Sequence, residues 1–532
     1  MKKVLIAMSV LALSSTAFSQ SEVDAFKYAQ GDLNGTARYL AMGGAFGALG
    51  GDISAMNGNP AGLAIYRSSE VVATLSLAGI SAKTDWLGTK ESNNRTKMSF
   101  DNIAYVGYFP TSNDVGVVSW NVGFSYNRLK NFRRNYTANA AGGIDYSLSD
   151  YVAARATAGG IPVTDLGITD KYNPYDPANG IGDWMAILGY DAGYIEAYSD
   201  NDRAYYSTFT EPDGTGYKMS NSRLEVQESG AIDQYDISAG INISDILMLG
   251  ATVAITDLNY DYISYYKEEF VNGNYLTLGN QGAGNWLSTD GTGYSFNIGA
   301  IVRPSDFLRV GVAYNSPIWY KMTDTYQTAA STDVNAFDKP LTSVTPQGAF
   351  TDYEFRSPDK WLFSVAGIFG KTALLSVDYE MVNYKNMRMY DNYGNANQQT
   401  NGFIKEDFGM GNTLRVGAEV KVTPQFAVRA GASWADSPMK DQLKDGLVEV
   451  MTVGTIPNYT IDKGITHYTV GLGYRFTPNF YTDIACVFKT HKEDVYAFSN
   501  MFDANGEYVV QSQPASLKTH TTRVALTLGY KF

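Results

Sequence analysis

The strongest constraint in this sequence of 532 residues is a hydrophobic period of two. In several long runs every second residue is apolar, while the residues between are small, polar or charged. Successive side chains of a β-strand point to opposite faces of the sheet, so this alternation predicts strands with one apolar face. The clearest runs are 118–126, 294–302, 414–422, 468–476 and 524–532.

These runs are too long for a soluble β-sandwich. Strands in globular proteins average about 5–6 residues, whereas a strand that crosses a bilayer at a tilt needs about 9–11. Aromatic residues end two of the runs, at 474–476 and 530–532, where a membrane barrel places its aromatic girdle. The opposite faces are rich in Gly, Asn, Ser and Arg, which suits a wet lumen. The pattern therefore favours a membrane barrel.

The spacing of the runs indicates how many strands there are. Short turns and long connections alternate along residues 70–532, as in outer-membrane barrels. We predict an all-β fold, a transmembrane antiparallel β-barrel of about 14 strands, closed because unpaired backbone is costly in lipid. The predicted strands are 70–78, 99–109, 115–127, 232–243, 247–264, 293–303, 308–319, 360–369, 373–384, 412–422, 426–434, 467–476, 479–488 and 519–532. The predicted long connections are 79–98, 128–231, 265–292, 320–359, 385–411, 435–466 and 489–518.

Composition argues against several functions. The formal net charge is −13, and an acidic surface does not suit a nucleic-acid partner. Cys486 is the only cysteine and three histidines are present, which disfavours Cys/His metal sites and haem ligation. No G-x-S-x-G nucleophile elbow occurs. We therefore expect no enzymatic activity, no metal and no cofactor.

The first residues have the features of an export signal. Lys2 and Lys3 precede a mostly apolar stretch, and Ala17-Phe18-Ser19 supplies small residues two apart. This pattern predicts a cleavable signal peptide over 1–19, since the apolar stretch is well short of the ~20 residues of a spanning helix. We expect the protein to be exported to the bacterial outer membrane.

Residues 20–69 precede the first predicted strand and do not alternate. Their glycine-rich run, 43–51, is followed by no Lys-Ser/Thr pair and preceded by no strand, so a phosphate-binding loop is disfavoured. Ala, Met, Leu and Phe make the segment too apolar for a solvated linker. We predict that 20–69 forms a compact hatch, or plug, inside the barrel.

Residues 38–63 resemble the N-terminal hatch of the FadL/TodX family of outer-membrane hydrophobic-compound transporters. The resemblance rests on the segments 41–46 (AMGGAF) and 59–61 (NPA), and it continues along the wall at 308–317, 376–380, 414–419, 428–431 and 471–476. It implies a monomer that takes up long-chain fatty acids or aromatic hydrocarbons passively. Extracellular loops would capture the ligand, the hatch would gate it, and a gap at a kinked third strand would release it laterally.

The resemblance also implies which residues form the gate. Pro60 fixes its own φ and disfavours a helical Asn59, so a fixed bend is expected there. The predicted gate residues are Asn59, Pro60, Ala61, Gly43, Gly44 and Phe46.

A ligand with a carboxylate would need a cation in the lumen, because arginine can hold a carboxylate bidentately. Arg309, Arg415 and Arg429 fall on predicted inward faces and are possible ligand contacts. Each could instead pair with a wall carboxylate such as Glu419.

The connection 128–231 is far longer than the family pattern. Within it Ile181, Trp184, Met185 and Leu188 have helical spacing, which predicts an amphipathic helix. The helix either packs on the core of the loop or presents Trp184, Met185 and Leu188 as an apolar landing site for the ligand. Two other functions stay open, a protein-secretion partner that uses this large loop and a haemin-uptake receptor.

The C-terminus ends on aromatic residues. Tyr530 and Phe532 resemble the membrane-insertion signal of outer-membrane barrels. The expected partners are therefore the barrel-assembly machinery, outer-membrane lipid and a hydrophobic small molecule.

Overall fold

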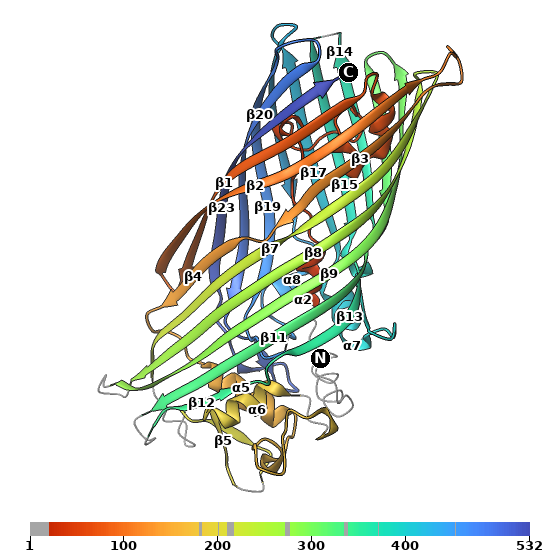
Figure 1. Ribbon diagram of the computed structural model, residues 1–532. Coiled ribbons are helices and arrows are strands. Elements are labelled where there is room, and N and C mark those ends of the chain that lie inside the picture. Colours follow the sequence, from red (N-terminus) through yellow and green to blue (C-terminus); the bar gives the residue numbers. More distant parts are fainter. Residues whose placement is uncertain are drawn as a thin grey trace.

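The computed structural model describes residues 21–179, 183–199, 202–209, 218–271, 277–334, 339–370, 372–452 and 454–532. The predicted signal peptide, 1–19, lies outside these residues. The described chain forms a tall antiparallel barrel (Figure 1). The first strand pairs with the last, from Glu70 opposite Lys531 to Asp85 opposite Ser516, so the sheet closes on itself.

The sheet consists of 19 hydrogen-bonded segments. Where consecutive segments continue one another along the wall, they form one strand, and the wall then has 14 strands, which confirms the prediction. The combined segments are β3 with β4, β10 with β11, β12 and β13 with β14, and β15 with β16. The segments are β1 (Glu70–Trp86), β2 (Thr89–Pro110), β3 (Val117–Asn131), β4 (Arg134–Ala140), β7 (Lys218–Ile243), β8 (Leu247–Val271), β9 (Thr277–Ser305), β10 (Leu308–Asn315), β11 (Trp319–Val334), β12 (Leu341–Val344), β13 (Ala349–Arg356), β14 (Lys360–Phe369), β15 (Ala373–Asn383), β16 (Arg388–Asp391), β17 (Met410–Lys421), β18 (Phe426–Ala435), β19 (Tyr459–Arg475), β20 (Phe480–Tyr496) and β23 (Ala515–Lys531).

The apolar face of each predicted run points outward. On β23, Leu526, Leu528 and Tyr530 are 40–51 % exposed, whereas Thr527 between them is 1 % exposed and faces the lumen. An apolar outer face is stable only against lipid, which is the environment that the alternation predicts.

Outward aromatic side chains mark the two edges of the membrane band. Beside the short turns, Phe109 stacks on Trp120 with ring centroids 4.1 Å apart. Roughly 10 residues further along the strands, the length that crosses a bilayer at a tilt, Tyr294 stacks on Trp319 with centroids 5.4 Å apart. Trp and Tyr prefer such interfaces, so the second level is the outer, extracellular edge.

Beyond the outer edge the strands continue much further than predicted. β1 and β2 pair up to Trp86 and Thr89, where the sequence analysis placed the loop 79–98. β7, β8 and β9 likewise extend into the predicted connections 128–231 and 265–292. These loop boundaries were wrong because both faces of a strand outside the membrane can be polar, so pairing continues where the alternation stops.

A cap of loops covers the extracellular mouth (bottom of Figure 1). In it Tyr151 stacks on Phe498 with ring centroids 5.7 Å apart, which joins two long connections. Apart from the wall segments, the described secondary structure comprises α2 (Glu22–Ala29), α3 (Ala37–Ala41), α4 (Ala55–Gly58), α5 (Leu148–Ala158), α6 (Trp184–Asp191), α7 (Gln398–Asp407), α8 (Asp441–Lys444), the 3-10 helices η1 (Pro60–Ile65), η2 (Val163–Asp165), η3 (Pro177–Asn179) and η4 (Tyr384–Asn386), and the hairpins β5 (Ile195–Ala197) with β6 (Tyr205–Ser207) and β21 (Met501–Phe502) with β22 (Tyr508–Val510).

The predicted amphipathic helix is α6, but it is not amphipathic. Five consecutive residues, 185–189, are buried, so the helix is enclosed on all sides within the cap. Ile181 lies outside the described residues.

The described N-terminal residues, 21–69, lie inside the barrel and are surrounded by its wall. α2 is followed by an extended stretch and then by the compact turn-rich part from α3 to η1. No helix in the described part of the chain is long and apolar enough to cross a membrane.

Deleting Phe532 should lower the amount of barrel in the outer membrane. Its amide donates to the carbonyl oxygen of Ser69 at 3.0 Å, and its ring lies 6.3 Å from the rings of Tyr105 and Tyr530. The deletion therefore removes both a closing hydrogen bond and the terminal aromatic. Heat-modifiability of the outer-membrane band on gels measures the effect; wild-type amounts of folded band would contradict it.

Candidate functional site

From here on, "hatch" means residues 36–66, the turn-rich part of the predicted segment 20–69. Its backbone packs directly against the barrel wall. Wall glycines on β7, β8, β9, β10, β17, β18 and β19 make this possible, because an added Cβ would overlap the hatch. A Cβ at Gly240, for example, would lie 2.9 Å from the amide nitrogen of Ala64, and one at Gly43 would lie 2.8 Å from that of Ala432. The wall glycines that contact the hatch include Gly123, Gly240, Gly250, Gly299, Gly311, Gly417, Gly431 and Gly471.

Polar wall side chains bind the hatch backbone. Asp378 on β15 accepts hydrogen bonds from the amides of Phe46 and Gly47 at 2.9 and 2.8 Å. Asn121 on β3 donates to the carbonyl oxygens of Leu63 and Tyr66 at 2.6 and 3.2 Å. Such groups add hydrogen-bond partners for the backbone of a segment whose helices are short.

Asn59 links the turn around Gly47 to η1 within the hatch, and it also links the hatch to the wall. It is 1 % exposed, and its side chain donates to the carbonyl oxygens of Gly47 at 2.7 Å and of Ala300 on β9 at 3.3 Å. Its Oδ1 accepts from the amide of Ala61 at 3.1 Å, which caps η1 at Pro60. Gly43 and Gly44 both have positive φ, +62° and +80°, in the turn after α3.

A buried network of charges also holds the hatch. Arg38 of α3 lies 2.9 Å from Glu419 on β17, and Arg429 on β18 lies 2.6 Å from the same carboxylate and 2.5 Å from Asp483 on β20. The guanidinium of Arg38 also stacks 5.3 Å from the ring of Phe46.

The arginines predicted as ligand contacts all have protein partners. Arg309 donates to the carbonyl oxygen of Leu49 at 2.5 Å, Arg415 lies 3.1 Å from Glu380, and Arg429 belongs to the Glu419 network. The structure therefore places Arg309 and Arg429 at the interface between hatch and wall.

Between α2 and the hatch an extended segment crosses the lumen. We call residues 30–35 the strap. Lys489 lies 2.8 Å from Asp32, and Arg523 donates to Asn34 at 2.9 Å. Although burial opposes ionisation, Lys489 and His467 hold the pKa of Asp32 well below its usual range.

Two cavities flank the strap. The first, of ≈ 190 Å³, lies against β1, β2, β3, β19, β20 and β23. The second, of ≈ 210 Å³, lies against β9, β10, β14, β15, β17 and β18. Gln30, Gly31, Asp32 and Asn34 line both, so the strap divides the lumen.

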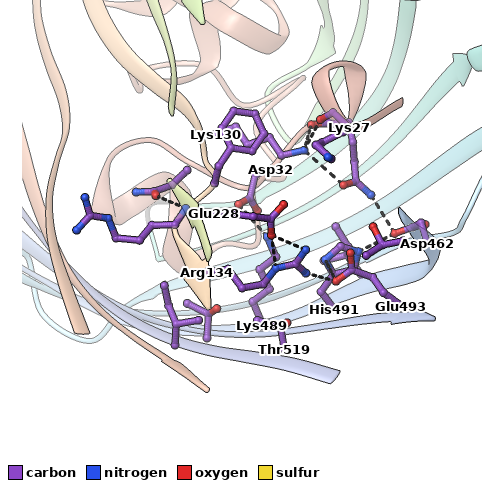
Figure 2. Close-up of a pocket in the computed structure, with 18 of the residues that line it drawn as sticks. Lys27, Asp32, Lys130, Arg134, Glu228, Asp462, Lys489, His491, Glu493 and Thr519 are labelled. Atoms are coloured by element: carbon purple, nitrogen blue, oxygen red, sulfur yellow. Dashed lines mark hydrogen bonds and ion pairs between the residues drawn. The ribbon is translucent and has the colours of Figure 1, made fainter. Parts of the chain in front are cut away.

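The first cavity is lined by both charged and apolar side chains (Figure 2). Phe132, Tyr262 and Leu287 are among the apolar ones. The lining has eight Lys or Arg and six Asp or Glu. The basic residues are Lys27, Lys97, Arg128, Lys130, Arg133, Arg134, Lys489 and Arg523.

Several of these cations make no direct ion pair within the described residues. Lys130 donates to the carbonyl oxygens of Lys27 and Gln30 at 2.7 and 3.2 Å, at the end of α2. Within the described part of the chain, Lys97, Lys130 and Arg133 make no ion pair with a carboxylate. Arg134, in contrast, pairs with Glu228 at 2.7 Å and with Glu493.

The wall beside the first cavity is interrupted. The ladder between β2 and β3 stops at Asn102 opposite Asn127, and β3 has a register shift between Arg128 and Lys130. The rest of β2, up to Thr89, pairs only with β1. The break lies at the outer membrane edge, where Phe100 stacks on Tyr126 at 5.8 Å.

Trp184, Met185 and Leu188 lie in the extracellular cap. Met185 and Leu188 are buried, and Trp184 packs on Tyr175 and Tyr326 with ring centroids 5.1 and 5.7 Å away. Their packing corresponds to the first of the two alternatives, a helix in the core of its own loop.

Sequence reasoning missed the wall glycines, Asp378, Asn121 and the basic residues of β2 and β3. The glycines carried a signal, since they recur at inward positions of the alternating runs. Lys130 and Arg133 carried none, because they lay in a segment interpreted as loop.

The fold and the lumen define a class: an outer-membrane β-barrel with an internal hatch. The chain belongs to the family described as outer membrane protein transport protein (OMPP1/FadL/TodX), whose model matches residues 226–532, more than half of the chain.

Individual relatives are distant. Outer membrane protein P1 of Haemophilus influenzae is 22 % identical over 249 residues, 45 % of this chain and about half (47 %) of that protein. A FadL homologue of Pseudomonas aeruginosa has a similar structure, with a TM-score of 0.50 at 14 % identity over 94 % of this chain and 100 % of that one. The toluene transporter TodX of P. putida gives 0.46 at 13 % identity over 94 % and 99 %.

Proposed function

We propose that the protein is a passive outer-membrane transporter for hydrophobic molecules with an anionic head, of which long-chain fatty acids are the simplest. The mixed lining of the first cavity carries this proposal. Its apolar side chains suit a hydrocarbon tail, and Lys97, Lys130 and Arg133, which make no ion pair with a described carboxylate, suit an anionic head.

The route would run from the cap to the membrane. The ligand would enter through the extracellular loops, bind in the first cavity and displace the hatch, and leave laterally at the break between β2 and β3. Ligand binding can open the hatch only by as much as the ligand prefers the open form, since equal affinity for both forms shifts nothing. Lateral exit spares an apolar molecule the transfer into water, which would cost about 0.8 kcal/mol per CH₂.

Replacing Asn59 by alanine should change uptake without preventing insertion. The variant removes the hydrogen bond to Ala300 of the wall, worth about 0.5–1.5 kcal/mol, and the bonds to Gly47 and Ala61 within the hatch, so the closed hatch is weakened. We expect uptake of radiolabelled oleate to rise about threefold to tenfold, as a cost of roughly 1 kcal/mol to the closed state implies.

Toluene uptake measured in parallel tests whether the substrate needs the anionic head. Asn113→Ala, in an exposed periplasmic turn, is the control. Wild-type uptake of both compounds by a folded Asn59→Ala barrel would contradict a gating role. Absence of oleate uptake by the wild-type protein would contradict the proposed function itself.

A further inference from the structure

A second break in the wall lies on the opposite side of the strap, beside the second cavity. β18 ends at Ala435, opposite Ile465. On the extracellular side of this pair β19 pairs only with β20. There β19 has a bulge between Asp462 and Ile465 that contains Gly464, with φ +102°. We call this place the β18–β19 seam.

On the outside, the seam opens into a pocket of ≈ 340 Å³. The side of the pocket toward the membrane is apolar and lipid-facing, with Tyr379, Leu414 and Trp434 each 39–40 % exposed. Trp434 packs edge-on against Tyr468 at 6.3 Å, so the pocket lies at the outer aromatic edge of the membrane.

Charged side chains line the rest of the pocket. Lys463 pairs with Asp494 at 2.9 Å, and Asp436 accepts from the amide and side chain of Asn412 at 2.6 and 3.0 Å. Lys492 is exposed and makes no ion pair with any described carboxylate.

The wall is thin between the outer pocket and the second cavity. In an intact sheet each side chain faces one side only. At the seam five residues line both the outer pocket and the luminal cavity: Asn412, Ala435, Asp436, Gly464 and Ile465. The two cavities therefore reach the wall at the same place, where Gly464 has no side chain.

On the extracellular side of these residues, the short segment 436–439 closes the seam. Residues 436–439 bind β17 through the amide of Gly409, which donates to the carbonyl oxygen of Pro438 at 2.7 Å. Toward β19 the hydroxyl of Ser437 donates to the carbonyl oxygen of Asp462 at 2.7 Å. The connection is also joined to β19 by Lys463, whose Nζ donates to the carbonyl oxygen of Lys444 at 3.0 Å. These are side-chain contacts and not a strand ladder, so the segment can separate from β19 without breaking a ladder.

We propose that the β18–β19 seam is a second lateral portal, which lets the hydrocarbon chain of an amphiphile pass between the outer leaflet and the second cavity. This rests on the proposed function for the identity of the amphiphile. The lysines would hold its anionic head while the chain lies on Leu414 and Trp434. The two luminal cavities would then each have their own opening to lipid.

Thiol labelling from the lipid phase tests the portal without relying on transport. The full-length mature protein carries Cys486→Ala and either Ala435→Cys or Ser433→Cys, and is reconstituted in phospholipid vesicles with bilayer-dissolved N-(1-pyrenyl)maleimide. Both positions face inward on β18, but Ser433 lies within the intact ladder, opposite His467. We expect Ala435→Cys to react about tenfold faster, because a thiol reacts only where the reagent reaches it.

A second substitution identifies the route of the reagent. Leu414→Trp fills the outer pocket and should reduce labelling of Ala435→Cys to the rate of Ser433→Cys. Val420→Trp, on the same lipid-facing side of β17 but outside the pocket, should leave the rate unchanged. Ile465→Cys replaces Ala435→Cys as the reporter if the latter does not give a heat-modifiable barrel.

Equal rates at the two positions, or no effect of Leu414→Trp, would overturn the portal even if oleate is taken up. Absence of oleate uptake with the expected labelling pattern would instead overturn the proposed substrate and leave the portal standing.

Discussion

Replacing Gly250 by leucine should prevent the hatch from docking while the barrel still folds. Gly250 on β8 lies against the backbone of Pro60 and Ala61, and an added Cβ would overlap both residues. Overpacking of a tight contact costs about 1–3 kcal/mol when side chains can adjust. Here the obstacle is backbone, so the barrel can relieve the overlap only by displacing the hatch.

Hydrogen exchange measures this displacement. We expect amides of residues 36–66 to lose protection by about a hundredfold, the equivalent of roughly 3 kcal/mol, while amides of β8 and β9 keep theirs. Ala251→Leu is the matched control, because the neighbouring side chain faces lipid. Unchanged protection of the hatch in a folded Gly250→Leu barrel would show that the wall yields instead.

Replacing Glu419 by alanine should release the hatch through electrostatics. Glu419 is 3 % exposed and is the carboxylate shared by Arg38 and Arg429. Removing one partner of a buried ion pair costs about 3–5 kcal/mol, because the remaining charge is left buried and unpaired. Arg429 keeps Asp483, so the loss falls mainly on Arg38 and on the docking of α3.

Limited proteolysis at Arg38 measures loosening of the hatch, and the unfolding temperature measures the stability of the barrel. We expect rapid cleavage in the hatch with Glu419→Ala and intermediate behaviour with Glu419→Gln, which keeps an acceptor but not the charge. Glu380→Ala is a useful comparison, since it removes the partner of Arg415 but touches no hatch arginine. Equal resistance of Glu419→Ala and wild-type protein would mean that the network does not hold the hatch.

Within the membrane the sequence was sufficient to predict the strands. Lipid requires an apolar outer face and a paired backbone, and these two requirements impose the alternation and the closure of the barrel directly. Runs such as 468–476 and 524–532 therefore lie where the period predicts. Outside the membrane neither requirement applies, so the extensions of β7, β8 and β9 were interpreted as loops.

The α6 helix shows the same limit of prediction from a local sequence pattern. Its spacing of apolar residues predicted a helix, and a helix is present. Which of its sides would be covered depended on α5 and on β11 and β12, more than a hundred residues away, and residues 185–189 are buried as a result.

The sequence by itself determined the class of fold and the inward and outward faces, because each is imposed by a local pattern or by the contrast between lipid and water. Only the tertiary structure decided what the inward polar residues do. Arg309 binds the hatch backbone, and Arg429 pairs with the wall carboxylate that also binds Arg38 of the hatch. Lys97, Lys130 and Arg133 instead line the cavity and make no ion pair with a described carboxylate. The breaks at β2–β3 and β18–β19 depend on which strand ends first beside its neighbour. Such contacts join residues far apart in the chain, so no local pattern specifies them.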